Sequence, residues 1–164
     1  MTTKEREWWL FMQDNLRLSR EEIIICYEED VRKLIKYIPW LEKVSGESTT
    51  GIYSGDGIDK TSMSVPVYDS TLLGFIKEAK TTCFIDRNYV YTFSRYNIKT
   101  AEDEKRVISA CTLQDMKVLG DILSKYVIRG DVKGAVWAEG IQNGVYKLLV
   151  LKLKELMEIH KPLV

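Results

Sequence analysis

The chain has 164 residues, of which 45% are hydrophobic and 29% are charged, as is typical of folded globular domains. This length fits one domain, 1–164, whose core is large enough to fold without disulfides. The 24 basic and 24 acidic residues balance, so the chain lacks the positive field that drives binding to nucleic-acid phosphates. The composition therefore argues against a disordered chain and against nucleic acid as the partner.

The first predicted element is an amphipathic helix over residues 4–17. Thr3 is a candidate N-cap, and an apolar face follows at helical spacing. Two adjacent tryptophans, Trp8 and Trp9, lie on this face together with Phe11. They can dock on the body of the domain or contact a second copy, whereas the acidic residues of the segment argue against a membrane surface. We expect a homo-oligomer, a dimer, formed through this helix.

A second helix is predicted over 20–38, because Ser19 and Glu22 have capping-box spacing and Pro39 follows the apolar pattern. Residues 45–64 contain four glycines and no apolar period, so they predict a long flexible loop or lid. The "GDGIDKT" stretch in this loop does not fit a phosphate-binding loop, because Asp59 stands where a glycine is needed.

Further helices are indicated by caps and spacing. Asp69 or Ser70, Asp86, Thr100 and Thr112 are candidate starts. Gly130 is expected to end the helix after Thr112 in a left-handed cap. A helix over 132–143 and a strongly apolar, central helix over 145–159 complete the chain, separated by Gly144. No convincing strand pattern is present, and the sequence predicts an all-α, compact helical bundle of about seven or eight helices.

Cysteine and histidine usage excludes several chemistries. Cys26, Cys83 and Cys111 are far apart and His160 is the only histidine, which is a poor set for a metal. A histidine-activated nucleophile is disfavoured for the same reason. We expect no metal, no cofactor, and cysteines that act as small core residues. Unpaired thiols without a signal peptide indicate the cytoplasm, and no apolar run reaches the roughly 18 residues that span a membrane.

The stretch "YVIRGDVKGAVWAEGIQNG" at 126–144 is the best candidate site. A helix that begins near Val132 would present unpaired amides to an anion, with Arg129 and Lys133 beside them. Trp137 could stack on a base, and Glu139 could accept from a hydroxyl or an amino group. The remaining candidate ligand-binding residues are Asp131, Asn143, Tyr89, Tyr91 and Tyr96. The alternative is structural, with Trp137 in the core and the charges serving as caps.

The same stretch resembles an uncharacterised bacterial and phage family, the domain of unknown function numbered 6508. Its members show an R-G segment, a glycine-containing turn, W-A-E-x-I-x-N-G and a leucine-rich final helix with basic residues. The matching residues here are Arg129, Gly130, Trp137, Ala138, Glu139, Ile141, Asn143 and Gly144. The family's turn usually carries a second arginine and an aromatic residue, where this chain has Asp131 and Val132. The resemblance implies the fold and no established activity.

These features predict a non-catalytic module that binds a small anionic, nucleotide-like ligand. A phage protein that sequesters a nucleotide-derived immune signal in the cytoplasm of an infected bacterium is one such protein. A protein interaction or oligomerisation module is the first alternative. A nucleotide-processing hydrolase that uses Asp131 and Glu139 for acid–base chemistry is the second.

Overall fold

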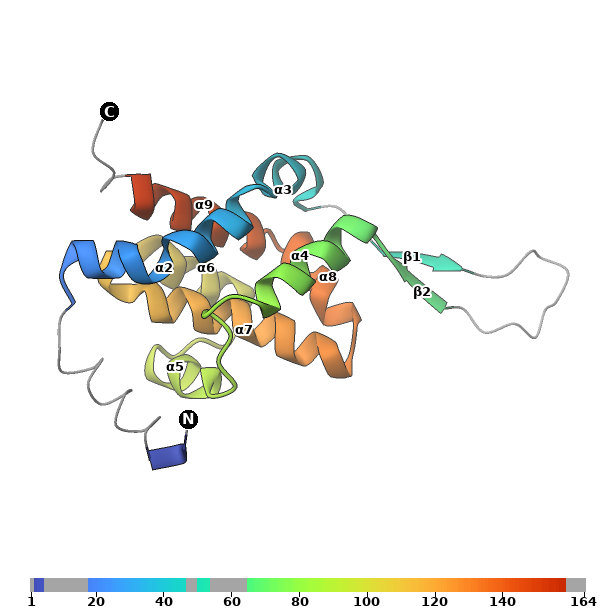
Figure 1. The fold of residues 1–164 in the computed structure, drawn as a ribbon. Coiled ribbons are helices and arrows are strands. Elements are labelled where there is room, and N and C mark those ends of the chain that lie inside the picture. The colour runs from blue at the N-terminus through green and yellow to red at the C-terminus, as the bar shows by residue number, and fades with distance from the viewer. Residues whose placement is uncertain (1, 5–17, 47–49, 54–64, 159–164) are drawn as a thin grey trace, which may run out of the picture.

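The computed structural model describes residues 2–4, 18–46, 50–53 and 65–158. Eight α-helices and a short 3-10 helix are present in these ranges, together with one two-stranded hairpin that projects away from the helices (Figure 1). The predicted all-α bundle is confirmed for this part of the chain. The elements are α2 (Arg20–Ile35), α3 (Ile38–Val44), β1 (Thr50–Tyr53), β2 (Val65–Tyr68), α4 (Ser70–Lys80), α5 (Tyr89–Arg95), α6 (Ala101–Ala110), η1 (Leu113–Asp115), α7 (Met116–Val132), α8 (Ala135–Gln142) and α9 (Val145–Glu158).

Local side-chain caps set most helix starts. The Ser19 hydroxyl accepts from the Glu22 amide at 3.2 Å and starts α2. Asp69 accepts from two amides of α4, and Thr100 forms a capping box at the start of α6. Thr112 forms a second box, which starts η1 and leads into α7. Each cap satisfies amides that have no partner within their own helix, so these predicted starts are confirmed.

Asp86 differs from its predicted role. Helix α5 begins three residues later than this aspartate, with Asn88 at the N-cap and no side-chain bond there. The Asp86 carboxylate instead accepts from the Asn88 amide at 2.9 Å, which makes a turn that leads into the helix.

The predicted end of the second helix at residue 38 is wrong, and a hairpin that the sequence did not predict is present. Helix α2 ends at Ile35, and Pro39 lies in the first turn of α3, a position where its missing N–H costs nothing. Strands β1 and β2 pair antiparallel, with Thr50 opposite Tyr68 and Tyr53 opposite Val65. Strand β1 lies within the predicted 45–64 loop and β2 follows it directly. Residues 47–49 and 54–64 of the loop are outside the described ranges.

Gly130 does not end its helix. It is a buried helical residue of α7, which continues to Val132, and the described glycines with positive φ are Gly46 and Gly144. The next helix therefore begins at Ala135, not near Val132. Gly144, at a φ of 79°, separates α8 from α9 as predicted.

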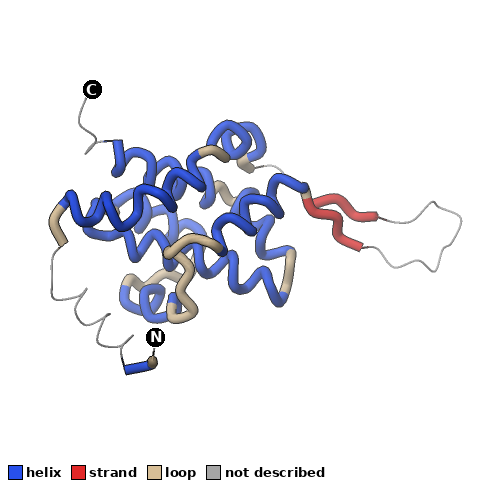
Figure 2. Tube along the Cα trace, in the orientation of Figure 1, coloured by secondary structure: helices blue, strands red, loops and turns tan. Residues whose placement is uncertain are grey.

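Helices α7 and α9 form the centre of the bundle. Helix α9 packs against α2, α3, α6, α7 and α8, which confirms its predicted central place, and α7 also contacts α4 and α5. Figure 2 shows that the body of the molecule is helical and that the strands lie only in the hairpin that projects from it. The largest fully buried side chains of the centre include Tyr126, Leu119 and Ile122 of α7 and Tyr146 of α9. The apolar helix predicted from the sequence thus shares the core with α7.

Several sequence predictions concern residues outside this core. The helix predicted over 4–17, with Trp8, Trp9 and Phe11, lies outside the described ranges apart from residue 4. Cys111 is buried as predicted, but Cys26 and Cys83 are exposed. In the described ranges, no helix is both long and apolar enough to cross a membrane.

Candidate functional site

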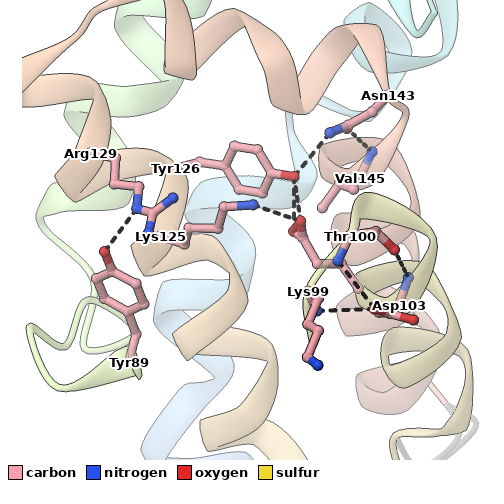
Figure 3. Close-up of polar contacts among 10 residues, drawn as sticks. Tyr89, Lys99, Thr100, Asp103, Lys125, Tyr126, Arg129, Asn143 and Val145 are labelled. Carbon is pink, nitrogen blue, oxygen red and sulfur yellow. Dashed lines mark hydrogen bonds and ion pairs between the residues drawn. The ribbon is translucent and has the colours of Figure 1, made fainter. Parts of the chain in front are cut away.

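Arg129 lies in the last turn of α7 and is exposed. Its Nε donates to the Tyr89 hydroxyl at 3.3 Å, which links the end of α7 to the start of α5 (Figure 3). Among the described residues the guanidinium forms no ion pair with a carboxylate. A hydroxyl group carries no charge, so this hydrogen bond does not compensate the positive charge of the arginine.

The backbone around Arg129 differs from the predicted anion site. Since α7 continues to Val132, the Lys133 amide is already bonded to the Arg129 carbonyl at 3.0 Å. The amides of Val136 and Trp137 donate to the Lys133 and Gly134 carbonyls. These three amides of the corner therefore already have carbonyl partners, which leaves fewer unpaired amides for an anion than the sequence predicts.

Trp137 packs on α7. Its Nε1 donates to the Val127 carbonyl at 3.1 Å, and its ring lies where a Cβ on Gly130 would be, at 1.9 Å from the nearest ring atom. The Lys80 ammonium lies 5.5 Å from the ring centroid and also pairs with Asp131 at 2.6 Å. Trp137 thus joins α8 to α7, and the cation over its ring occupies a place that a stacked base would need.

Asn143 belongs to a buried polar network between α6, α7 and the start of α9. Its Nδ2 donates to the Tyr126 hydroxyl at 2.9 Å, and its Oδ1 accepts from the Val145 amide at 2.9 Å. The Tyr126 hydroxyl donates toward the Glu104 carboxylate, whose oxygens lie 2.8 and 2.9 Å away. Lys125 pairs with the same carboxylate at 2.8 Å (Figure 3). Both polar atoms of the Asn143 side chain are therefore bonded to neighbours within the bundle.

This network keeps its phenol protonated. Glu104 is fully buried, at 0% exposure, but Lys125 and the phenol satisfy it. Burial, followed by the nearby Glu104 charge, raises the pKa of Tyr126 well above its ordinary value. Burial also raises the pKa of Tyr146, whose hydroxyl has no hydrogen-bond partner within the described residues. Neither phenol can act as a base near neutral pH.

The remaining predicted residues do not converge on one site. Glu139 and Lys133 are exposed, and Glu139 forms no bond with Asp131 in the described part of the chain. Tyr89 is buried against Phe93 at a centroid distance of 5.7 Å. Tyr91 is 73% exposed and lies on the opposite side of α5 from Tyr89. The predicted aromatic wall is therefore divided between the core and the surface.

Sequence reasoning missed a second buried carboxylate. Asp121 of α7 accepts from Lys117 at 2.8 Å and from the Thr92 hydroxyl of α5, while its Oδ1 has no partner within the described residues. Lys117 also reaches Asp86 at 3.4 Å. Burial raises the pKa of Asp121, although Lys117 and Thr92 oppose this effect. An aspartate at an otherwise apolar position of the α7 pattern is the signal that could have revealed it.

No metal centre is evident where the structure describes the chain, because no three His, Cys, Asp or Glu side chains come together there. Comparisons with protein-family models, with curated proteins and with solved structures give no match. The resemblance to the 6508 family stays a prediction.

Proposed function

We propose that the chain is a non-catalytic module that binds a small anionic ligand through Arg129 and Lys133. The observation that carries this proposal is that Arg129 bonds to a neutral phenol and to no described carboxylate. Lys133, four residues later, is exposed and likewise forms no ion pair among the described residues. Two uncompensated cations one helical turn apart form a local positive surface on a chain with no net charge.

The chemistry of these groups favours a phosphate or a carboxylate. A guanidinium whose Nε is held by Tyr89 still presents the two NH2 groups at its end, which can bind two oxygens of one anion. Lys133 supplies a flexible point charge that can reach a second phosphate. A nucleotide with more than one phosphate fits this pair better than a single inorganic anion.

A nucleotide-derived signal molecule, bound and withheld from its receptor, is the ligand class that we propose. Its phosphates would contact Arg129 and Lys133, with Lys80 close by on α4. Stacking of the base on Trp137 would require Lys80 to leave the ring, so the phosphates supply most of the affinity. Glu139, exposed on α8, is available to accept from a ribose hydroxyl or a base amino group.

Calorimetric titration with a panel of mono-, di- and cyclic nucleotides tests this function. We expect Arg129→Ala and Lys133→Ala each to weaken binding by about tenfold or more, as loss of one charge-assisted contact does. Lys43→Ala, which removes an exposed lysine of α3, is the matched control and should bind as the parent does. Equal affinities for all three variants, or no binding by any nucleotide of the panel, would contradict the proposal.

A further inference from the structure

Helix α2 exposes an isoleucine between acidic side chains. Ile25 is 79% exposed, and Glu21 and Glu29, four residues before and after it, are exposed as well. Residues at this spacing lie on one face of a helix. Neither glutamate forms an ion pair among the described residues, so this acidic surface (Glu21, Ile25 and Glu29) is uncompensated within the described chain.

The α5 segment carries basic side chains around an exposed aromatic residue. Tyr91 is exposed on α5, Arg95 follows four residues later on the same face, and Arg87 precedes it by four residues in the turn before the helix. The Tyr89 and Tyr91 amides bond to Asp86 and Asn88 carbonyls, so the turn continues into the helix. This basic surface (Arg87, Tyr91 and Arg95) matches the acidic one in spacing and has opposite charge.

The two surfaces belong to neighbouring parts of the molecule. The Tyr27 ring of α2 stacks on Phe84 at a centroid distance of 5.4 Å, and the Cys83 amide donates to Asp30 of α2 at 2.9 Å. Phe84 lies only three residues before Arg87. Helix α2 and the segment that leads into α5 are therefore in direct contact, and Figure 1 shows the two helices at the same end of the bundle.

We propose that the occupant of these surfaces is a second copy of this chain, in a two-fold dimer. The acidic surface of each copy packs on the basic surface of its partner, so the contact forms twice, as a closed two-fold interface requires. Ile25 and Tyr91 lose water at the centre of each contact, and the four charged side chains around them set the register. This proposal does not depend on the anion proposed for Arg129 and Lys133.

Charge complementarity favours a second copy over an anionic polymer. A nucleic acid that bound the basic surface would meet Glu21 and Glu29 on the neighbouring helix, and like charges there oppose binding. A second copy turns the same glutamates into partners. The contact is small and bordered by solvated charges, so we expect a concentration-dependent dimer that weakens as salt is added.

Sedimentation velocity over protein concentrations of about 1 µM to 1 mM tests the proposal. The parent should dimerise within this range, and both Glu21→Arg/Glu29→Arg and Arg87→Glu/Arg95→Glu should raise the dissociation constant by about tenfold or more. Lys43→Glu/Lys77→Glu, which reverses two exposed charges on α3 and α4, is the matched control and should leave it unchanged.

Mixing the two reversed variants makes the test specific. One variant then has two basic surfaces and the other has two acidic ones, so an equimolar mixture should form a heterodimer with the affinity of the parent, visible by native mass spectrometry. A parent that stays monomeric throughout the range, reversals that leave the dimer intact, or a mixture that stays monomeric would each overturn the proposal. Circular dichroism of each variant confirms that it is folded, and Tyr91→Ala supplies an independent variant that should also weaken the dimer.

Discussion

The Tyr126 hydroxyl connects groups that lie far apart in the chain. It donates to Glu104 of α6 and accepts from Asn143, which lies between α8 and α9. The carboxylate is buried, so its charge is tolerated only because Lys125 and this hydroxyl satisfy it. A single phenol thus holds three segments around one buried charge.

Tyr126→Phe should lower the free energy of unfolding by about 1–3 kcal/mol, because it leaves polar groups of Glu104 and Asn143 with one partner fewer in the core. Urea denaturation measures this change. Tyr89→Phe is the control: its hydroxyl serves the exposed Arg129, and its loss should change stability by no more than about 0.5 kcal/mol. If the two substitutions lowered the free energy of unfolding equally, the buried network would not stabilise the protein more than the exposed hydrogen bond does.

The contribution of Asp121 to stability should fall as pH rises. Burial raises its pKa in the folded protein, so the folded state binds the proton more readily than the unfolded state does. The contribution of this raised pKa to the free energy of unfolding is fully present below the unfolded pKa of about 3.9. It is lost as pH rises through the folded pKa. Asp121→Asn should therefore gain stability relative to the parent between pH 4 and 7, as followed by thermal unfolding in a pH series. A difference that stays constant or shrinks over this interval would contradict the raised pKa.

At the scale of elements, the space at one glycine lets α8 pack closely on α7. The Trp137 ring lies against Gly130, where an added Cβ would come within 1.9 Å of it. This glycine is helical, with no positive φ, so its role is to leave space for the ring and not to turn the chain. The Lys80 ammonium lies 5.5 Å from the centroid of the same ring, so α4 also contacts this corner.

Gly130→Ala should destabilise the protein by about 1–3 kcal/mol, because the ring must move and its bond to Val127 is disturbed. Differential scanning calorimetry and Trp fluorescence report the two effects. Gly74→Ala is the matched helical control, since its Cβ would meet only the Tyr37 hydroxyl at 3.4 Å. There the better helix propensity of alanine should stabilise by up to about 1 kcal/mol. The same sign for both substitutions would reject the packing argument.

The elements that the sequence predicts correctly are those set by local signals. Ser19, Asp69, Thr100 and Thr112 cap helices by bonds to amides two or three residues away, and such bonds leave a pattern in a short window. The end of α7 was mispredicted, because the space that Gly130 provides serves a residue of the next helix. The hairpin was missed because its strands are four residues each and contain Gly51 and Pro66.

The candidate site, too, could be predicted from the sequence only in part. Arg129, Lys133 and Glu139 are on the surface as a binding role requires, and the sequence placed them near one another. It could not show that Asn143 is held by Tyr126, 17 residues earlier, or that Tyr89 is the buried and Tyr91 the exposed residue of α5. Those facts depend on which helices pack together, and a motif within one segment does not carry that information.

At the scale of the whole molecule, charge is distributed unevenly on a chain that is neutral in total. The buried carboxylates Glu104 and Asp121 are compensated by Lys125 and Lys117 inside the bundle. The uncompensated charges among the described residues are at the surface, including two cations at the end of α7. These two surface cations are the groups on which the proposed ligand binding rests.

Native mass spectrometry of the protein purified from cells tests the binding function most directly. The parent should carry a small anionic ligand that dissociates on mild activation, and Lys43→Ala should carry it equally. The double variant Arg129→Ala/Lys133→Ala, shown to be folded by circular dichroism, should lose about nine-tenths of this ligand, because two tenfold losses of affinity combine to about a hundredfold, which lowers an occupancy of about nine-tenths to about one-tenth. A parent with no bound molecule, or a double variant that retains the ligand in full, would contradict the account.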